Sequence, residues 1–226
     1  MKLARPPKGE MALGVSSKTS LASPKSEVIS VRVVLCRVGS GCLSINPYAH
    51  NPFLKATLFL FRSSGLKLRD QILVFGFVPP GDIRPTDLGP VIIPEHEGFA
   101  CRQMSWGWRV PWDKKPLINA KSETITQLPT FKPHLQNRCL ILADGFFEKG
   151  IRFIQPGEPL FAMAGLWQPD AEGGKFTMLT TTPNASVSPY HHRMPFILRA
   201  EQLGAWLGDD WLAVLENPDR VVLEKI

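Results

Sequence analysis

The chain has 226 residues, of which 44% are apolar, and this is enough for one domain with a substantial core. Its net charge of +6 is unevenly spread: residues 1–70 carry 11 Lys/Arg and 3 Asp/Glu, whereas residues 71–226 carry 15 and 17. A uniformly basic nucleic-acid-binding surface is therefore excluded, and any such surface must be a local patch.

The cysteines and the apolar runs exclude further classes of protein. Cys36, Cys42, Cys101 and Cys139 form no CxxC pair and show no Cys/His spacing suited to zinc. We therefore expect free thiols in a reducing compartment, no metal and no other cofactor. The sequence contains no uninterrupted apolar run of about 18 residues and no secretory signal, so no membrane span is expected. We expect a cytoplasmic monomer, associated with the nucleoid if the source is bacterial.

The N-terminal part differs from the rest in composition. Residues 1–27 are rich in Lys, Ser, Pro and Gly, which predicts disorder. Val28–Cys36 has the β-branched content of a strand, and Leu54–Phe61 is either a strand or a short helix. We interpret residues 1–70 as an atypical basic extension, partly disordered, and residues 71–226 as the folded domain.

The first half of this domain reads as short strands separated by turns. The elements expected here are an apolar run at Ile72–Phe77, strands at Pro90–Ile93 and Gln103–Val110, a loop at Pro111–Pro116, a helix-compatible stretch at Ser122–Thr126, and a short helix at Phe131–Leu135.

The second half continues in the same way. Its expected elements are a strand at Cys139–Ala143 that continues through Phe146–Phe147, a hairpin formed by Phe153–Gln155 and Leu160–Gly165, a strand at Phe176–Thr182, a turn at Tyr190–Pro195, and a helix from Glu201–Leu207 that extends, interrupted, to Leu215. Strands joined by short connections predict a mostly antiparallel α+β domain rather than a doubly wound parallel sheet.

Two polar residues stand where apolar ones would pack better. Asn119 lies inside the run from Pro116 to Ala120, and Glu148 follows a strand-like run and two phenylalanines. A carboxylate in apolar surroundings is costly unless it is paired, hydrogen-bonded or protonated, so Glu148 is a candidate acid/base group with a raised pKa. Taken alone, Glu148 is better explained as a carboxylate at a strand end that leans into water.

Five blocks in order resemble the SOS response-associated peptidase (SRAP) family. They are DIRPTD (82–87), MSWGW (104–108), PLINAKSET (116–124), FKPHLQNRCLILADGFFEK (131–149) and HHRMPFIL (191–198). The resemblance implies twisted antiparallel sheets in a barrel-like core with a few peripheral helices. It also implies recognition of abasic sites in single-stranded DNA, as part of the response to DNA damage.

The family chemistry is covalent. An N-terminal cysteine closes a thiazolidine ring with the sugar aldehyde, and self-removal of the initiating methionine gives the family its peptidase name, so hydrolase, protease and lyase activities are implied. On the matching positions, Asn119 would orient the reacting groups, Glu148 would transfer protons and His191 would act as a second acid/base group. For the bound strand, Arg193 would hold a phosphate, Trp112 would stack on a base, and Lys121 and Thr180 would line the site.

Each assignment has a plainer alternative. Asn119 can be a satisfied turn residue, His191 and His192 a surface pair, Arg193 the partner of a nearby carboxylate, and Trp112 part of the loop packing. The five blocks together favour function over these alternatives.

Departures from the family pattern affect the covalent step most. The family begins Met-Cys-Gly-Arg, whereas this chain is written with Met1-Lys2-Leu3, so we expect the crosslinking to be impaired. Either residues 1–70 replace the family N-terminus through a misassigned start or frameshift, or the protein has diverged. Lys121 replaces an arginine and loses its bidentate geometry. Two other functions stay open: a non-catalytic single-stranded DNA-binding module, and a hydrolase that pairs Cys101 or Cys139 with His191.

Overall fold

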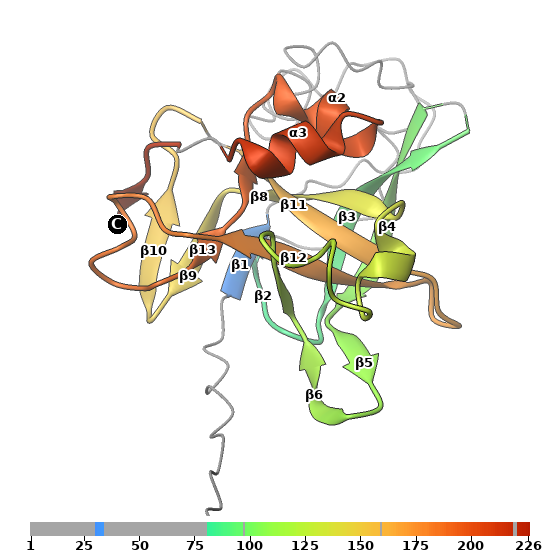
Figure 1. The fold of residues 1–226 in the computed structure, drawn as a ribbon. Helices are drawn as coiled ribbons and strands as arrows, with labels where there is room; N and C mark the ends of the chain where they lie inside the picture. The colour runs from blue at the N-terminus through green and yellow to red at the C-terminus, as the bar shows by residue number, and fades with distance from the viewer. Residues whose placement is uncertain (1–29, 34–80, 97, 159, 219–220) are drawn as a thin grey trace, which may run out of the picture.

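Strands dominate the molecule (Figure 1). The structure, a computed structural model, describes residues 30–33, 81–96, 98–158, 160–218 and 221–226. The expectations for 1–27, Leu54–Phe61 and Ile72–Phe77 lie outside the described residues. Within them, α-helix is limited to α2 (Gln202–Leu207) and α3 (Trp211–Glu216), which confirms the α+β class. Neither helix is long and apolar enough to cross a membrane.

An eight-stranded sheet forms the centre of the fold. Its strands are β3 (Leu88–Glu95), β4 (Gly98–Trp106), β7 (Asn119–Lys121), β8 (Arg138–Ala143), β11 (Phe161–Gln168), β12 (Lys175–Thr181), β13 (Met194–Pro195) and β14 (Ile197–Leu198). Strand β12 pairs with β11 and β13, which are antiparallel to it, and with β4 and β7, which are parallel to it. The remaining ladders are antiparallel, as the short connections predict. Closure into a barrel stays a prediction.

A five-stranded sheet packs beside it. It contains β1 (Ser30–Val33), β2 (Gly81–Ile83), β9 (Gly145–Glu148), β10 (Ile151–Ile154) and β15 (Glu224–Lys225). Strand β1 pairs with β9 on one side and β2 on the other, which confirms the strand predicted within Val28–Cys36. Residues before position 70 therefore contribute a strand to this sheet, while the domain division at position 70 stays a prediction.

The central sheet is buried on both faces, and β8 shows how. Cys139, Ile141 and Ala143 belong to one apolar cluster, together with Phe146 and Phe153 of the five-stranded sheet. The alternate residues, Leu140 and Leu142, belong to a second cluster with the helix residues Leu203 and Trp206. Because successive side chains of a strand point to opposite faces, a continuous apolar run such as this one is typical of a strand covered on both sides.

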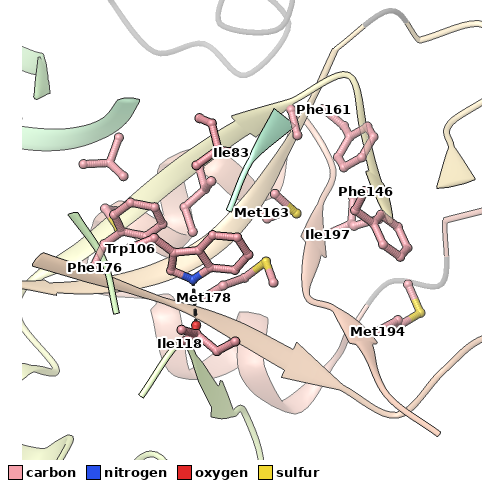
Figure 2. Packing of buried hydrophobic residues seen from close by; sticks show 14 of the residues in the cluster. Ile83, Trp106, Ile118, Phe146, Phe161, Met163, Phe176, Met178, Met194 and Ile197 are labelled. Carbon is pink, nitrogen blue, oxygen red and sulfur yellow. Dashed lines mark hydrogen bonds between the residues drawn. The ribbon is translucent and has the colours of Figure 1, made fainter. Parts of the chain in front are cut away.

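Trp106 is a fully buried member of the first cluster (Figure 2). Its ring stacks on Phe176 at a centroid distance of 6.2 Å, and its Nε1 donates to the carbonyl oxygen of Ile118 at 2.8 Å. The same carbonyl accepts from the backbone N–H of Met178 at 3.0 Å. The segment that leads into β7 is therefore held against β12 by a buried indole as well as by the strand ladder.

The prediction of a loop at Pro111–Pro116 is wrong for its second half, which is a strand. Strands β5 (Trp108–Val110) and β6 (Asp113–Leu117) form a hairpin that projects from the body of the fold (Figure 1). The predicted strand Gln103–Val110 divides at Gly107, where φ is +121° and an added Cβ would lie 2.8 Å from Cβ of Pro116. A residue without a side chain is required there because the chain turns out of the sheet and packs closely on its own return strand.

Two further expectations are corrected. Ser122–Thr126 forms consecutive turns, not a helix, because the Ser122 N–H donates to Thr180 O and continues the β7 ladder. The strands at Phe153–Gln155 and Leu160–Gly165 do not pair: β10 pairs with β9 and β15, and β11 pairs with β8, β12 and β14. The turn at Pro156–Gly157 connects two sheets.

The turn expected at Tyr190–Pro195 is wrong in its last part, because Met194–Pro195 form β13. The strand expected to continue from Cys139–Ala143 through Phe146–Phe147 divides into β8 and β9. The short helix expected at Phe131–Leu135 is a single 3₁₀ turn, η3 (Lys132–His134), and the interrupted helix near the C-terminus is the pair α2 and α3. Phe146 and Phe147 lie in β9, which leaves the central sheet and joins the smaller one.

Candidate functional site

The C-terminal half of β12 pairs with two segments that are distant from it and from each other in sequence. In the parallel ladder with β7, Met178 lies opposite Asn119 and Thr180 lies opposite Lys121. On the other edge of β12, Thr180 lies opposite Pro195 of β13, which directly follows the His191–Arg193 segment. The strand pairing therefore brings Asn119, Lys121 and Thr180 to one end of the sheet.

Glu148 and His191 form a buried pair. Oε2 of Glu148 lies 3.4 Å from Nδ1 of His191, and the two side chains are 1% and 5% exposed. Glu148 ends β9 immediately before the two-residue turn Lys149–Gly150, where φ is +49° and +80° as a type I′ hairpin turn requires. The tight turn fixes the direction of the strand end, so the carboxylate points inward rather than into water.

A backbone carbonyl fixes the orientation of the His191 ring. Nδ1 lies 2.9 Å from the carbonyl oxygen of Arg193, which can only accept a hydrogen bond. The backbone N of Arg193 lies 3.4 Å from the same Nδ1, so both polar backbone groups of this residue face that ring nitrogen and leave Nε2 on the other side of the ring. The His192 ring lies 4.4 Å away, centroid to centroid. His192 is exposed but His191 is buried, so the two histidines are not a surface pair.

Arg193 is bound by a carboxylate from the segment after β7. Its two terminal nitrogens donate to the two oxygens of Glu123, each at 2.8 Å, and one of them also donates to the backbone oxygen of Thr180. The hydrogen bonds from Arg193 lower the pKa of Glu123 below its usual value. The alternative that Arg193 pairs with a nearby carboxylate is confirmed, and its contact with a phosphate stays a prediction.

Asn119 and Lys121 are adjacent on β7 but differ in their surroundings. Oδ1 of Asn119 is buried and has no hydrogen-bond partner, whereas the Lys121 side chain is exposed. A buried amide oxygen without a partner is uncommon in folded proteins and is a reason to expect a ligand there. Lys121 places a cation at the solvent boundary of the same strand.

Trp112 lies at the tip of the β5–β6 hairpin and is 69% exposed. The alternative that Trp112 serves only to pack its loop is therefore wrong, because most of its ring is in contact with solvent. The structure brings Glu148 to His191, Thr180 to Arg193 and Lys121 to β12, and places Trp112 on the projecting hairpin.

Glu123 is the residue that the sequence did not single out. It stands two residues after Lys121 in a polar stretch and resembles a solvated surface carboxylate. Its partner is 70 residues away in sequence. The sequence suggested that Arg193 could pair with a nearby carboxylate. It did not indicate that this carboxylate is Glu123.

The cysteine hydrolase is disfavoured by the surroundings of both described thiols. Cys139 is fully buried in β8, and burial raises its thiol pKa. Burial also raises the pKa of Cys101 to about 12, although the nearby Arg102 opposes the shift. A thiolate is the nucleophilic form, and neither thiol forms it near neutral pH. Among the described residues, no cluster of three or more His, Cys, Asp or Glu is arranged to hold a metal.

Comparison with known proteins places the chain in a family. The model of the SOS response associated peptidase (SRAP) family matches residues 72–217, so the chain belongs to the SRAP family and the resemblance is confirmed. It is 32% identical over 180 residues to the abasic site processing protein YoqW of Bacillus subtilis, covering 66% of this chain and 80% of the relative. It is 35% identical over 115 residues to YedK of Escherichia coli, covering 45% and 50%.

A vertebrate protein and a solved crystal structure also match this chain. The abasic site processing protein HMCES of Gallus gallus is 30% identical over 166 residues, covering 54% of this chain and 48% of the relative. A crystal structure of a Bordetella bronchiseptica protein superposes with a TM-score of 0.56 at 27% identity, covering 67% of this chain and 89% of that one. The fold described above is therefore shared with solved proteins.

Proposed function

We propose that this protein binds abasic sites in single-stranded DNA as a monomer and that Glu148 and His191 act on the exposed sugar. The observation that carries the proposal is the buried Glu148–His191 contact, with the imidazole oriented by the Arg193 carbonyl. Family membership supports it, because the relatives are named abasic site processing proteins. A paired, desolvated acid and base at a strand end is the arrangement that proton transfer requires.

The reaction we propose is opening of the abasic sugar. The closed sugar is a cyclic hemiacetal, and opening breaks the bond between C1′ and the ring oxygen O4′ to give an aldehyde and a hydroxyl. Glu148 accepts the proton of the C1′ hydroxyl while protonated His191 donates a proton to O4′. Exchange with solvent then removes the proton from Glu148 and returns one to Nε2 of His191, so no net proton is consumed.

The neighbouring residues position the strand. The buried Oδ1 of Asn119 would accept a hydrogen bond from the reacting group, and Lys121 and Thr180 would line the strand path on β7 and β12. Arg193 would neutralise a phosphate if it exchanged Glu123 for it, and Trp112 would stack on a base.

The covalent step of the family is a separate question. Thiazolidine formation needs a cysteine with a free α-amine, because both the amine and the sulfur attack the aldehyde. Cys101 and Cys139 are internal and partly or fully buried, so neither closes that ring. We propose that recognition and sugar opening depend on the residues above and do not require either thiol.

Binding to three matched oligonucleotides tests the proposal. A labelled single strand would carry either a natural abasic site, a tetrahydrofuran analogue that lacks the C1′ hydroxyl, or an intact base. We expect tighter binding to the natural site than to the other two by fluorescence anisotropy, and loss of the preference over the analogue in Glu148→Gln. Equal affinity for all three strands would refute the proposal. A denaturing gel of the same samples reports any covalent adduct.

A second candidate is a single-stranded DNA-binding module without chemistry. The exposed Trp112 favours it, since a solvent-exposed indole beside a cationic surface stacks on any base. This candidate predicts salt-sensitive binding with no preference for the abasic strand, and the three oligonucleotides therefore separate the two functions.

A further inference from the structure

Residues Val221–Ile226 form a strap that connects the two elements carrying Glu148 and His191. At its C-terminal end the strap includes β15, which pairs with β10, and the N–H of Ile226 donates to Arg152 O at 3.0 Å. Strand β10 in turn pairs with β9, which ends at Glu148. Figure 1 shows the C-terminus beside β10. The strap is therefore fixed to the hairpin that carries the carboxylate.

At its N-terminal end the strap is bound to the turn that leads into His191. Nδ2 of the buried Asn184 donates to Val221 O at 2.6 Å. Two residues further along the strap, the N–H of Leu223 donates to Oγ of Ser186 at 3.4 Å. The strap therefore contacts the segment before the imidazole as well as the strand pair of the carboxylate.

Asn184 also holds the turn itself. Its Oδ1 accepts from the N–H groups of Ser186 and Val187 at 3.0 and 3.1 Å. The carbonyl oxygen of Val187 then accepts from the N–H groups of Tyr190 and His191 at 2.9 and 3.0 Å. A series of hydrogen bonds therefore runs from the strap through Asn184 and Val187 to the backbone of His191.

Apolar and aromatic contacts reinforce the connection. Val221 and Leu223 are each 5% exposed and belong to the first apolar cluster, against which Tyr190 also packs. The Tyr190 ring, in the residue before the histidine, meets Phe153 of β10 edge-on at a centroid distance of 5.8 Å. Nζ of Lys225 lies 5.1 Å from the centroid of the same ring. The tyrosine therefore contacts both β10 and the strap.

We propose that the strap sets the separation of Glu148 and His191, and that Asn184 is the positioning residue through which it acts. Because the strap is bound to both elements, a change in the 3.4 Å contact strains or breaks its hydrogen bonds. Proton transfer depends steeply on such a separation. The strap lies outside residues 72–217, which the family model matches. It deepens the proposed function, on which it rests for the reaction that the pair performs.

Amide hydrogen exchange of the full chain tests the strap without any DNA. Leu223→Ala and Leu203→Ala each shorten a buried leucine, the first in the strap and the second in the cluster on the other face of the central sheet. Leu223→Ala should raise the exchange rate of the His191 backbone N–H by about 10-fold over that in Leu203→Ala, because exchange needs local opening of the turn. Val222→Ala changes an exposed strap residue and should match the parent.

Asn184→Asp separates the strap contact from the turn. The carboxylate keeps both acceptor contacts with the turn but cannot donate to Val221 O. Exchange between the anomers of a bound abasic sugar, followed by NMR of ¹³C at C1′, should fall by about 10- to 100-fold, since a misplacement of about 1 Å can cost 100-fold. Affinity for the tetrahydrofuran strand should stay within about twofold of the parent, because the change removes no contact with the ligand.

Two results would overturn the strap as a positioning element. One is equal exchange of the His191 amide in Leu223→Ala and Leu203→Ala. The other, where Glu148→Gln does slow anomer exchange, is anomer exchange in Asn184→Asp that is as fast as in the parent. Failure of the proposed function is distinguishable from both, because Glu148→Gln then leaves anomer exchange unchanged while the His191 amide still reports whether the strap holds the turn.

Discussion

The His191 segment and the β5–β6 hairpin present polar groups to the same proposed ligand in opposite ways. Around His191 the side chains are buried and held by specific partners: Glu148 at 3.4 Å, the Arg193 carbonyl at 2.9 Å and, one step further, the Glu123 carboxylate. On the hairpin, Arg109, Lys114, Lys115 and Trp112 are exposed.

The difference follows from what each region is proposed to do. Proton transfer depends on distance and orientation, so its groups must be fixed before the ligand arrives, and burial with hydrogen bonds achieves this. Attraction of a polyanion depends on net charge and falls off slowly with distance, so flexible exposed cations are sufficient. The two regions should therefore respond differently to mutation, salt and pH.

The largest expected contrast is in stability, between two arginines. Arg193→Ala should lower the free energy of unfolding by about 1 to 2 kcal/mol, because Glu123 loses both donors and the Thr180 carbonyl keeps only the N–H of Ser122. Arg109→Ala should change it by less than about 0.5 kcal/mol, because Arg109 is exposed and has no partner among the described residues. Urea unfolding of both variants measures this directly. Similar losses in the two would remove the distinction between a fixed and a free region.

A second contrast is in affinity and concerns Trp112. Trp112→Ala should weaken binding to lesion-free single-stranded DNA by about 1 to 3 kcal/mol, the usual contribution of one stacked base. Trp112→Phe keeps an aromatic face and should recover most of the affinity. Fluorescence anisotropy at one fixed salt concentration gives both values. If alanine and phenylalanine bind alike, the indole does not stack on a base.

The smallest expected effect is the pH dependence of the Glu123–Arg193 pair. The pKa of Glu123 is lowered from 4.5 in the folded protein, so the unfolded state binds the proton first as pH falls. The contribution of the pair is therefore complete above pH 4.5 and is lost as pH falls through the folded-state pKa. Because Glu123 is largely exposed, it amounts to about 1 kcal/mol or less.

Thermal unfolding of Glu123→Gln at several pH values checks this expectation. The variant should melt below the parent at pH 7, and the gap should close in acid. Glu216→Gln is a suitable control, since Glu216 is exposed and has no ion pair within the described residues. A gap that persists unchanged into acid would mean that the carboxylate acts through packing rather than charge.

Two strands of the central sheet, β8 and β12, were readable from the sequence because one is a nearly continuous apolar run and the other is rich in apolar and β-branched residues. All six residues of β8 and six of the seven residues of β12 are buried, and the bounds of both runs were predicted to within one residue at each end. The pairing of β10 and β11 was misread because adjacent strands joined by a Pro-Gly turn usually form a hairpin. Which sheet each joins depends on partners that are distant in sequence.

The hairpin escaped prediction for a related reason. Strand β6 begins Asp113-Lys114-Lys115 and buries none of these side chains, so it shows no apolar alternation. Its strand conformation depends on pairing with β5 and on the turn at Gly107, which are tertiary constraints.

The site was predicted in parts. Glu148 and His191 were found through the family blocks, because a polar residue after an apolar strand gave one signal and the HHRMP block the other. Their contact joins residues 43 positions apart and could not be read from either segment alone. Glu123 was missed because an exposed carboxylate in a polar stretch resembles any solvated surface residue.

Exchange at C1′ reports most directly whether the Glu148–His191 pair opens the abasic sugar. An oligonucleotide with ¹³C at C1′ of one abasic site shows two hemiacetal anomers, which interconvert through the open aldehyde. We predict that the protein raises the exchange rate measured by NMR by roughly 100-fold, and that Glu148→Gln and His191→Asn return it close to the rate of free DNA. An exchange rate that the bound parent protein leaves unchanged, or that Glu148→Gln raises equally, would contradict it.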